Sequence, residues 1–175
     1  MKKSKQYAVT PAEVLIIDDD RSLLFTAKSV IEGEGHHVRT ASNGRDGLSM
    51  VEKKRPDIII LDLMMPELDG YEVCRRLKNV PASENIPVLF LSSHGRPEEK
   101  VKAFEVGGVD YLVKPYSTLE LLIRLRTHLV FQHIQKTLNI QIEKRTEELC
   151  IDALTMAARL IDKTPTELKQ YINKK

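Results

Sequence analysis

Three aspartates stand side by side in the stretch IIDDD at residues 16–20. Like charges at this spacing repel one another, and carboxylates are seldom buried without a partner. Asp18, Asp19 and Asp20 therefore require a compensating positive group, such as a bound cation or a lysine. Because the aspartates follow an apolar run, they mark the end of a buried strand as a place where chemistry is expected.

Other polar residues follow apolar runs of the same kind. The runs and the residues after them are DIIIL and Asp62, VLFL and Ser92, and YLV and Lys114. In an open α/β sheet, ligands bind beyond the carboxyl ends of the strands, where the strand order reverses. These three side chains are therefore expected to converge on one crevice with Asp18 and Asp19.

The chemistry of such a set is narrow. Clustered carboxylates with oxygen-only partners favour a hard divalent cation, typically Mg²⁺, which keeps several of its waters. One carboxylate can then act as a nucleophile toward a phosphoryl group. The cation, the lysine and the hydroxyl would neutralise the oxygens of the transferred group.

Five apolar runs and four amphipathic stretches alternate along residues 14–116. Strands are expected at 14–17, 36–41, 57–61, 88–91 and 111–113, and helices at 21–33, 43–54, 69–79 and 97–106. Near-continuous apolar strands are typical of a parallel sheet covered on both faces. The pattern predicts an α/β fold with a doubly wound, five-stranded parallel sheet. Asp20 is expected to cap the first helix, and Ser42 the second.

The chain has 175 residues and a formal net charge of +2. This length suits one well-packed domain and a further segment, and the charge is too small to imply nucleic-acid binding. No run approaches the roughly 18 apolar residues of a membrane-spanning helix. Cys74 and Cys150 fit no metal-ligand or redox spacing, and no secretion signal is apparent. These features indicate reduced thiols and a cytoplasmic protein.

Residues 14–116 resemble the receiver domain of bacterial two-component response regulators. The motifs that carry the resemblance are IIDDD, ILDLMMPELDG, VLFLSS and DYLVKP, in this order. The resemblance implies a flavodoxin-like fold. It also implies that Asp62 accepts a phosphoryl group from a histidine kinase or a phosphotransfer protein.

The same resemblance implies roles for the other residues of the site. Asp19 would bind Mg²⁺ directly and Asp18 through water, with Asp62 and the backbone carbonyl of Met64 as further ligands. Two residues would contact the phosphoryl oxygens, and an aromatic residue would swing inward on phosphorylation. The two contact residues are Ser92 and Lys114, and the aromatic residue is Tyr111.

Each of these residues also has an ordinary structural interpretation. Asp18 or Asp19 alone is as well suited to capping the next helix. A single lysine after a strand is usually solvated, and a single tyrosine such as Tyr111 usually belongs to a core. Only the joint placement of four polar residues at four strand ends favours the chemical interpretation.

A long helix is expected after the receiver-like region. Ser117 and Glu120 have the spacing of a capping box, and the helix runs from 118 to about 163, before a short helix that begins at Pro165. Steps of four and three residues form one stripe, which Arg145 interrupts. Its members are Ile134, Leu138, Ile142, Arg145, Leu149, Ala153, Met156 and Leu160. A helix cannot bury such a stripe alone, so it pairs with a second copy in a coiled coil or folds back on its own domain.

The resulting organisation is a leader at 1–12, a receiver domain at 13–127 and a helical extension at 128–175. The preferred function is a phosphorylation-dependent switch that changes protein–protein contacts in a homodimer. No cyclase, phosphodiesterase or kinase signature follows Lys114, so the chain is not expected to catalyse an output reaction of its own. One alternative is a transcription factor with a weak helix-turn-helix at 156–172. Another is the receiver fragment of a larger signalling enzyme.

Overall fold

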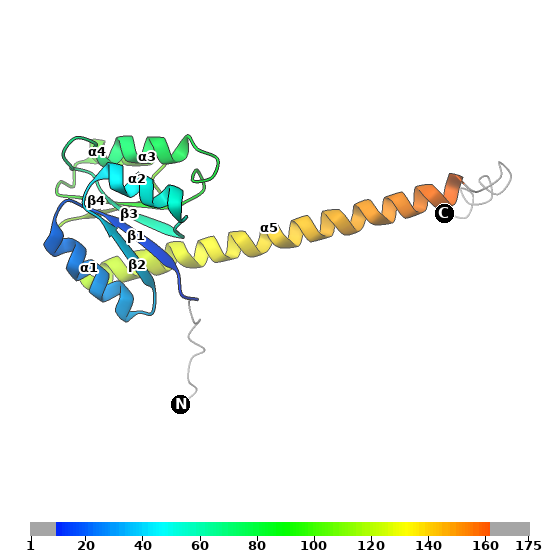
Figure 1. The fold of residues 1–175 in the computed structure, drawn as a ribbon, viewed down its shortest axis with the longest axis horizontal. Coiled ribbons are helices and arrows are strands. Elements are labelled where there is room, and N and C mark those ends of the chain that lie inside the picture. Colours follow the sequence, from blue (N-terminus) through cyan, green and yellow to red (C-terminus); the bar gives the residue numbers. More distant parts are fainter. Residues whose placement is uncertain (1–9, 162–175) are drawn as a thin grey trace, which may run out of the picture. The chain divides into compact units, whose positions relative to one another are not determined.

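The computed structural model describes residues 10–161, in which five strands alternate with five helices (Figure 1). The strands are β1 Glu13–Ile17, β2 His37–Ala41, β3 Ile58–Asp62, β4 Val88–Ser92 and β5 Asp110–Val113. The helices are α1 Arg21–Gly33, α2 Gly44–Lys53, α3 Gly70–Lys78, α4 Pro97–Glu105 and α5 Thr118–Ile161. The predicted fold class is confirmed.

The five strands form one parallel sheet in the order β2-β1-β3-β4-β5. The chain moves from β1 to β2 on one side and then crosses to β3 on the other. Strand order therefore reverses between β1 and β3, and a crevice is expected beyond their carboxyl ends. Asp18 directly follows β1, and Asp62 is the last residue of β3.

Successive side chains of each strand enter two different cores, because side chains alternate across a sheet. Leu15 and Ile17 of β1 pack with α2, α3 and α4 on one face. Val14 and Ile16 pack with α1 and the first turns of α5 on the other face. All four side chains are fully buried, which accounts for the uninterrupted apolar run at 14–17.

The helix starts agree with most of the predicted caps. The Asp20 carboxylate accepts hydrogen bonds from the amides of Ser22 and Leu23, so the predicted cap of α1 is confirmed. The prediction that Ser42 caps α2 is wrong, because the Asn43 side chain accepts the hydrogen bond from the Asp46 amide. Both residues are good caps, and the path of the loop after β2 decides between them.

Helix α5 is described in two parts, since the chain divides into units at Met1–Gln132 and His133–Lys175. In the first unit, three leucines of α5 are buried against the sheet, namely Leu121, Leu125 and Leu129. In the second unit, each side chain that the structure describes is exposed. The predicted domain boundary at residue 127 stays a prediction, and residues 162–172 of the predicted helix-turn-helix lie outside the described residues.

No helix in the described part of the chain is both long and apolar enough to cross a membrane.

Candidate functional site

Two buried carboxylates meet where β1 and β3 end. Asp18 is fully buried and Asp62 is 2% exposed, whereas Asp19 is exposed. One ligand atom from each of the three aspartates lies within 4.8 Å of the others. The structure thus brings together the carboxylates that the strand ends predicted.

Lys114, which follows β5, compensates these charges. Its Nζ lies 2.7 Å from Asp18 Oδ2 and 2.6 Å from Asp62 Oδ1. Burial alone would lower the pKa of this lysine, but the hydrogen bonds with Asp18 and Asp62 and the negative charges of both aspartates together outweigh burial and raise it. Lys114 therefore stays protonated, and its positive charge offsets the repulsion between the neighbouring carboxylates.

The Asp62 carboxylate remains incompletely compensated. Burial raises its pKa, and repulsion from Asp18 raises it further, although the hydrogen bond from Lys114 acts in the opposite direction. An ionised group with a raised pKa is held at a cost in free energy. An additional positive charge beside Asp62 would recover that cost, which makes the cluster receptive to a cation.

Backbone amides fix the orientation of both carboxylates. The Asp20 amide donates to Asp18 Oδ1 at 2.9 Å, and the Met64 amide donates to Asp62 Oδ2 at 3.0 Å. Each carboxylate therefore directs one oxygen to its own loop and the other to Lys114. The loop after β3 approaches Asp62 closely, as the predicted ligand role of Met64 requires, while the Met64 side chain is 60% exposed.

Ser92 and Tyr111 form a second polar group beside this cluster. Ser92 is fully buried one residue beyond Leu91, which is the β4 partner of Asp62. Its hydroxyl donates to the His94 carbonyl at 2.9 Å. The Tyr111 side chain is buried, and its hydroxyl also donates to the His94 carbonyl. The tyrosine therefore lies inward in this structure, and its predicted inward swing on phosphorylation stays a prediction.

The residue that links Ser92 to Tyr111 was missed by sequence reasoning. Glu99 of α4 places Oε2 within 3.3 Å of both hydroxyls. No motif indicates this contact, because it depends on how the loop between β4 and α4 folds. The only sequence signal is weak: Glu99 follows a proline that starts a helix.

A further missed contact anchors α5 to the sheet. Asp110 at the start of β5 lies 2.7 Å from Arg124 Nη1 and 2.9 Å from His128 Nε2. Burial would raise the pKa of Asp110, but hydrogen bonds with His128, the Tyr111 amide and Arg124 lower it below its ordinary value. These contacts stabilise the first part of α5.

Gly70 allows the loop after β3 to close behind Asp62. A Cβ on Gly70 would lie 2.3 Å from the Asp62 carbonyl oxygen and 2.9 Å from Leu63 Cα. Both neighbours are backbone atoms, so they cannot yield without moving Asp62 itself. The absence of a side chain at this position is therefore a condition for the site.

Gly70→Ala is expected to destabilise the protein by about 1–3 kcal/mol or more, the usual cost of overpacking. Gly33→Ala is the matched control, because no atom lies within 4 Å of a Cβ there. It is expected to be neutral or to stabilise α1 by up to about 1 kcal/mol. Urea unfolding measures both, and equal midpoints for the two variants would contradict the prediction.

A comparison with protein families matches the response regulator receiver domain over residues 14–126. The chain belongs to this family. The match begins in β1, ends in the buried part of α5 and contains every predicted site residue. The resemblance seen in the sequence is thereby confirmed.

Known relatives share the receiver domain with this chain. The response regulator MprA of Mycolicibacterium vanbaalenii is 38% identical over 116 residues, which cover 66% of this chain and 49% of MprA. The DNA-binding dual master transcriptional regulator RpaA of Synechocystis is 39% identical over 113 residues, which cover 65% of this chain and 47% of RpaA. The chain spans about half the length of these relatives.

Solved receiver structures agree with the fold. The chemotaxis protein CheY4 of Vibrio cholerae matches with a TM-score of 0.65 and 32% sequence identity. The match covers 67% of this chain and 98% of CheY4. The match therefore includes nearly all of CheY4 and about two thirds of this chain.

Proposed function

We propose that this receiver domain accepts a phosphoryl group on Asp62 from the phosphohistidine of a histidine kinase or a phosphotransfer protein. The observation that carries the proposal is the bridge from Lys114 Nζ to Asp18 and Asp62 at the carboxyl ends of the strands. A protonated lysine within 2.6 Å of a buried carboxylate can stabilise negative charge that develops on an attached phosphoryl group.

The proposed step is a displacement at phosphorus. An Asp62 carboxylate oxygen forms the new P–O bond while the P–N bond of the donor breaks, and its electron pair stays on the imidazole nitrogen. The amide of Met64 holds one Asp62 oxygen and Lys114 holds the other, so the carboxylate is oriented before the donor arrives. This orientation is the contribution of the chain itself.

Mg²⁺ fits the donor set of the site. Asp18, Asp19 and Asp62 offer carboxylate oxygens in one cluster, and the incompletely compensated charge of Asp62 favours a cation. We propose that these aspartates and the Met64 carbonyl hold the ion, with Asp18 acting through water. When bound, Mg²⁺ neutralises charge on the phosphoryl oxygens.

The remaining site residues receive distinct roles. Lys114 and Ser92 contact phosphoryl oxygens, and Tyr111 is the aromatic residue that lies inward when the domain is phosphorylated. The hydroxyl of Ser92 contributes less than Lys114, because one neutral hydrogen bond is typically worth about 1 kcal/mol. The chain is proposed to act as a switch and to carry no output reaction.

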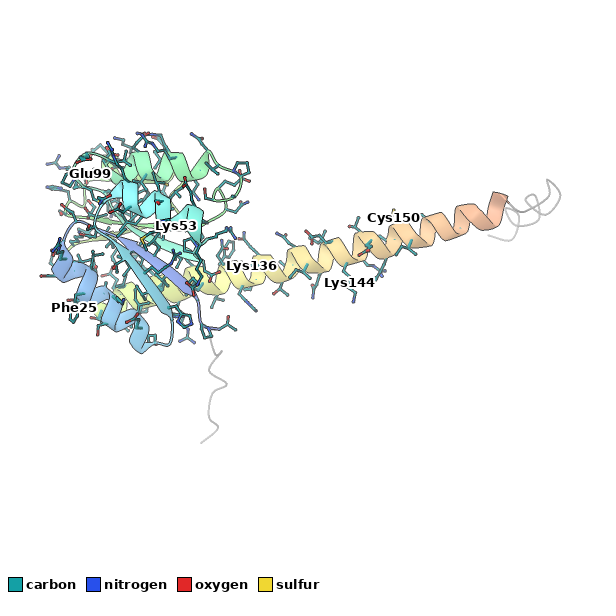
Figure 2. The ribbon with its side chains drawn as sticks, in the orientation of Figure 1. Phe25, Lys53, Glu99, Lys136, Lys144 and Cys150 are labelled. Atoms are coloured by element: carbon teal, nitrogen blue, oxygen red, sulfur yellow. The ribbon has the colours of Figure 1, made fainter. Side chains whose placement is uncertain are left out.

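The phosphodonor protein is proposed to approach along α1. A groove of about 570 Å³ lies between α1 and the segment after β5, and Lys114 forms part of its wall. Leu23, Ala27 and Tyr116 make much of it apolar. Phe25 of α1 is 76% exposed, and it adds an aromatic anchor suited to a partner helix (Figure 2).

The output is proposed to be a change in protein contacts within a homodimer formed through α5. Ile134, Leu138, Ile142 and Leu149 lie on one face of the helix and are 49–63% exposed. An exposed apolar stripe of this kind is stabilised when a second copy covers it. The name of RpaA describes that relative as DNA-binding, and this property is not part of the function proposed for this chain.

Phosphorylation of the intact chain by a small phosphodonor tests the proposed step. We expect addition of one phosphate in the presence of Mg²⁺, and little or none in excess chelator, because the ionised cluster repels an anionic donor. Intact mass spectrometry measures the product. Full labelling in chelator would contradict the role of the cation.

A further inference from the structure

A charged residue, Arg145, interrupts the apolar stripe of α5. Its Nη1 lies 3.1 Å from Oε2 of Glu148, which stands three residues later on the helix. The two side chains are 73% and 49% exposed, so water solvates this ion pair in a single copy of the chain. A second copy that covers the stripe would remove part of that water. Such a loss costs free energy unless the covering surface supplies compensating charge. The residues that face Arg145 therefore decide how two copies can pair.

The two edges of the stripe differ in charge. Side chains advance by about 100° per residue around a helix, which places Arg145 and Glu148 on the same edge. Thr146 and Cys150 lie on the other edge, where Figure 2 labels Cys150. The Thr146 hydroxyl already donates to the Ile142 carbonyl at 2.8 Å. One edge thus carries both signs of charge, whereas these two side chains of the other edge are neutral.

A parallel pair of helices leaves Arg145 without a partner of opposite charge. When a twofold axis runs along the two helices, each edge of the stripe meets the opposite edge of the second copy. Arg145 would then lie beside Thr146 and Cys150 of the second copy, and the two Arg145 side chains would stand at the same level. Like charges placed close together in an interface are destabilising. The charge pattern of α5 therefore disfavours the parallel arrangement.

An antiparallel pair compensates the same charges. When the twofold axis is perpendicular to the helices, each edge of the stripe meets the same edge of the second copy. With the axis at Arg145, the Arg145 side chain of each copy would lie beside Glu148 of the other. Positive and negative groups would alternate around the axis, so each arginine gains a second carboxylate. The charged edge is therefore complementary to itself only in the antiparallel orientation.

The apolar residues also fit a reversal about Arg145. Ile142 stands three residues before Arg145 and Leu149 four residues after it, so Ile142 of one copy would pack beside Leu149 of the other. By the same count, the reversal places Leu138 beside Ala153. A large side chain opposite a small one fills the interface better than two alanines, which a parallel pair would bring together. The weak position at Ala153 is thereby accounted for.

We propose that α5 pairs with α5 of a second copy in the antiparallel orientation, centred on Arg145 and held in register by reciprocal ion pairs between Arg145 and Glu148. The inference rests on the homodimer of the proposed function and specifies its geometry. A polar residue within an apolar interface commonly fixes register and orientation at some cost in stability. Arg145 and Glu148 are therefore the residues that select the partner and its direction.

Disulfide trapping in the intact chain tests the orientation. Ile142→Cys, Leu149→Cys and the double variant are made with Cys150→Ser and oxidised mildly. A disulfide requires Cα atoms within about 7 Å, and residues seven apart on one helix are about 10 Å apart, so the double variant cannot close within one chain. We expect covalent dimers from the double variant and little from either single variant. Covalent dimers from Leu149→Cys alone would indicate a parallel pair and overturn the proposal.

Exchange of the two charges provides a second test. Glu148→Arg would gather four positive groups around the axis, so the dissociation constant of the dimer is expected to rise about tenfold or more. Glu147→Arg is the matched control, because it makes the same charge change on the face away from the stripe, and an effect below about threefold is expected. Combining Arg145→Glu with Glu148→Arg restores alternating charges and is expected to return the constant to within about threefold of the wild type. Sedimentation equilibrium measures all four proteins.

The outcomes separate the orientation from the proposed function. A dimer whose dissociation constant is equally sensitive to Glu148→Arg and Glu147→Arg would overturn the role of the ion pairs and leave the homodimer standing. A monomeric wild-type chain would refute the homodimer itself, and the antiparallel pair with it. Phosphorylation of Asp62 is measured independently by intact mass and does not depend on either result.

Discussion

Asp62→Asn is expected to abolish phosphorylation by a small phosphodonor. The amide that replaces the carboxylate is not a nucleophile toward phosphorus, and the cation cluster loses one of its three carboxylates. The folded protein is expected to be as stable as the wild type or more so. Burial raises the pKa of Asp62, so its ionised form is held at a cost that the neutral amide avoids. Intact mass and thermal unfolding measure the two effects.

Asp69→Asn is the matched control for this change. Asp69 lies on the same loop, where its exposed side chain caps α3 by accepting from the Glu72 amide. Asparagine is an equally good cap, so the fold is expected to be unchanged and labelling to match the wild type. Equal labelling of Asp62→Asn and the wild type would place the phosphate elsewhere and refute the assignment.

Leu138→Asp is expected to convert an elongated dimer into a monomer. If the apolar face of α5 forms the seam between two copies, this change places an unpaired charge in a dry interface, at a cost of several kcal/mol. Light scattering with small-angle X-ray scattering at several concentrations measures the mass and the dimensions. A chain that ends at Gln132 keeps the buried Leu129, and it is expected to be monomeric and still take phosphate.

Ile140→Asp is the matched control for the seam. Ile140 is 64% exposed and Leu138 is 51% exposed, so both changes remove a solvated apolar side chain and add one charge. Two residues advance a helix by about 200°, which places Ile140 on the opposite face. The dimer is expected to survive this change. A monomeric wild-type protein would refute the seam, and a dimer that survives Leu138→Asp would place the interface on the receiver domain.

The sequence predicted the parts of the site that depend on strand ends. Asp18, Asp62, Ser92 and Lys114 each follow a run of buried residues, and a parallel sheet must bring such positions to one edge. The period of an apolar run is a local property, and for this reason the strands and helices could be placed within a few residues. The cap of α2 was predicted at Ser42 and is found at Asn43, because the two adjacent residues are equally suited to capping.

The contacts that sequence reasoning missed depend on loop paths and on side chains far apart in the chain. Glu99 reaches Ser92 and Tyr111 only because of the path of the loop at residues 93–96, and no local pattern encodes that path. The contact of Asp110 with His128 joins a strand to a helix across 18 residues. Glu99 and Asp110 are polar residues of types that are usually solvated at the surface, so residue type alone did not indicate either contact.

The spacing of the apolar stripe on α5 has a consequence for the choice of partner. Ile134, Arg145 and Met156 stand eleven residues apart, and Leu138 and Leu149 repeat the same interval. Eleven residues in three turns give about 3.67 residues per turn, whereas the seven-residue repeat of a left-handed coiled coil requires about 3.5. Two helices joined along this stripe would twist gently in the right-handed sense. A helix with a seven-residue repeat would drift out of register within a few turns. The period of the stripe therefore disfavours partners of that kind, whereas a copy of the same chain matches it by construction.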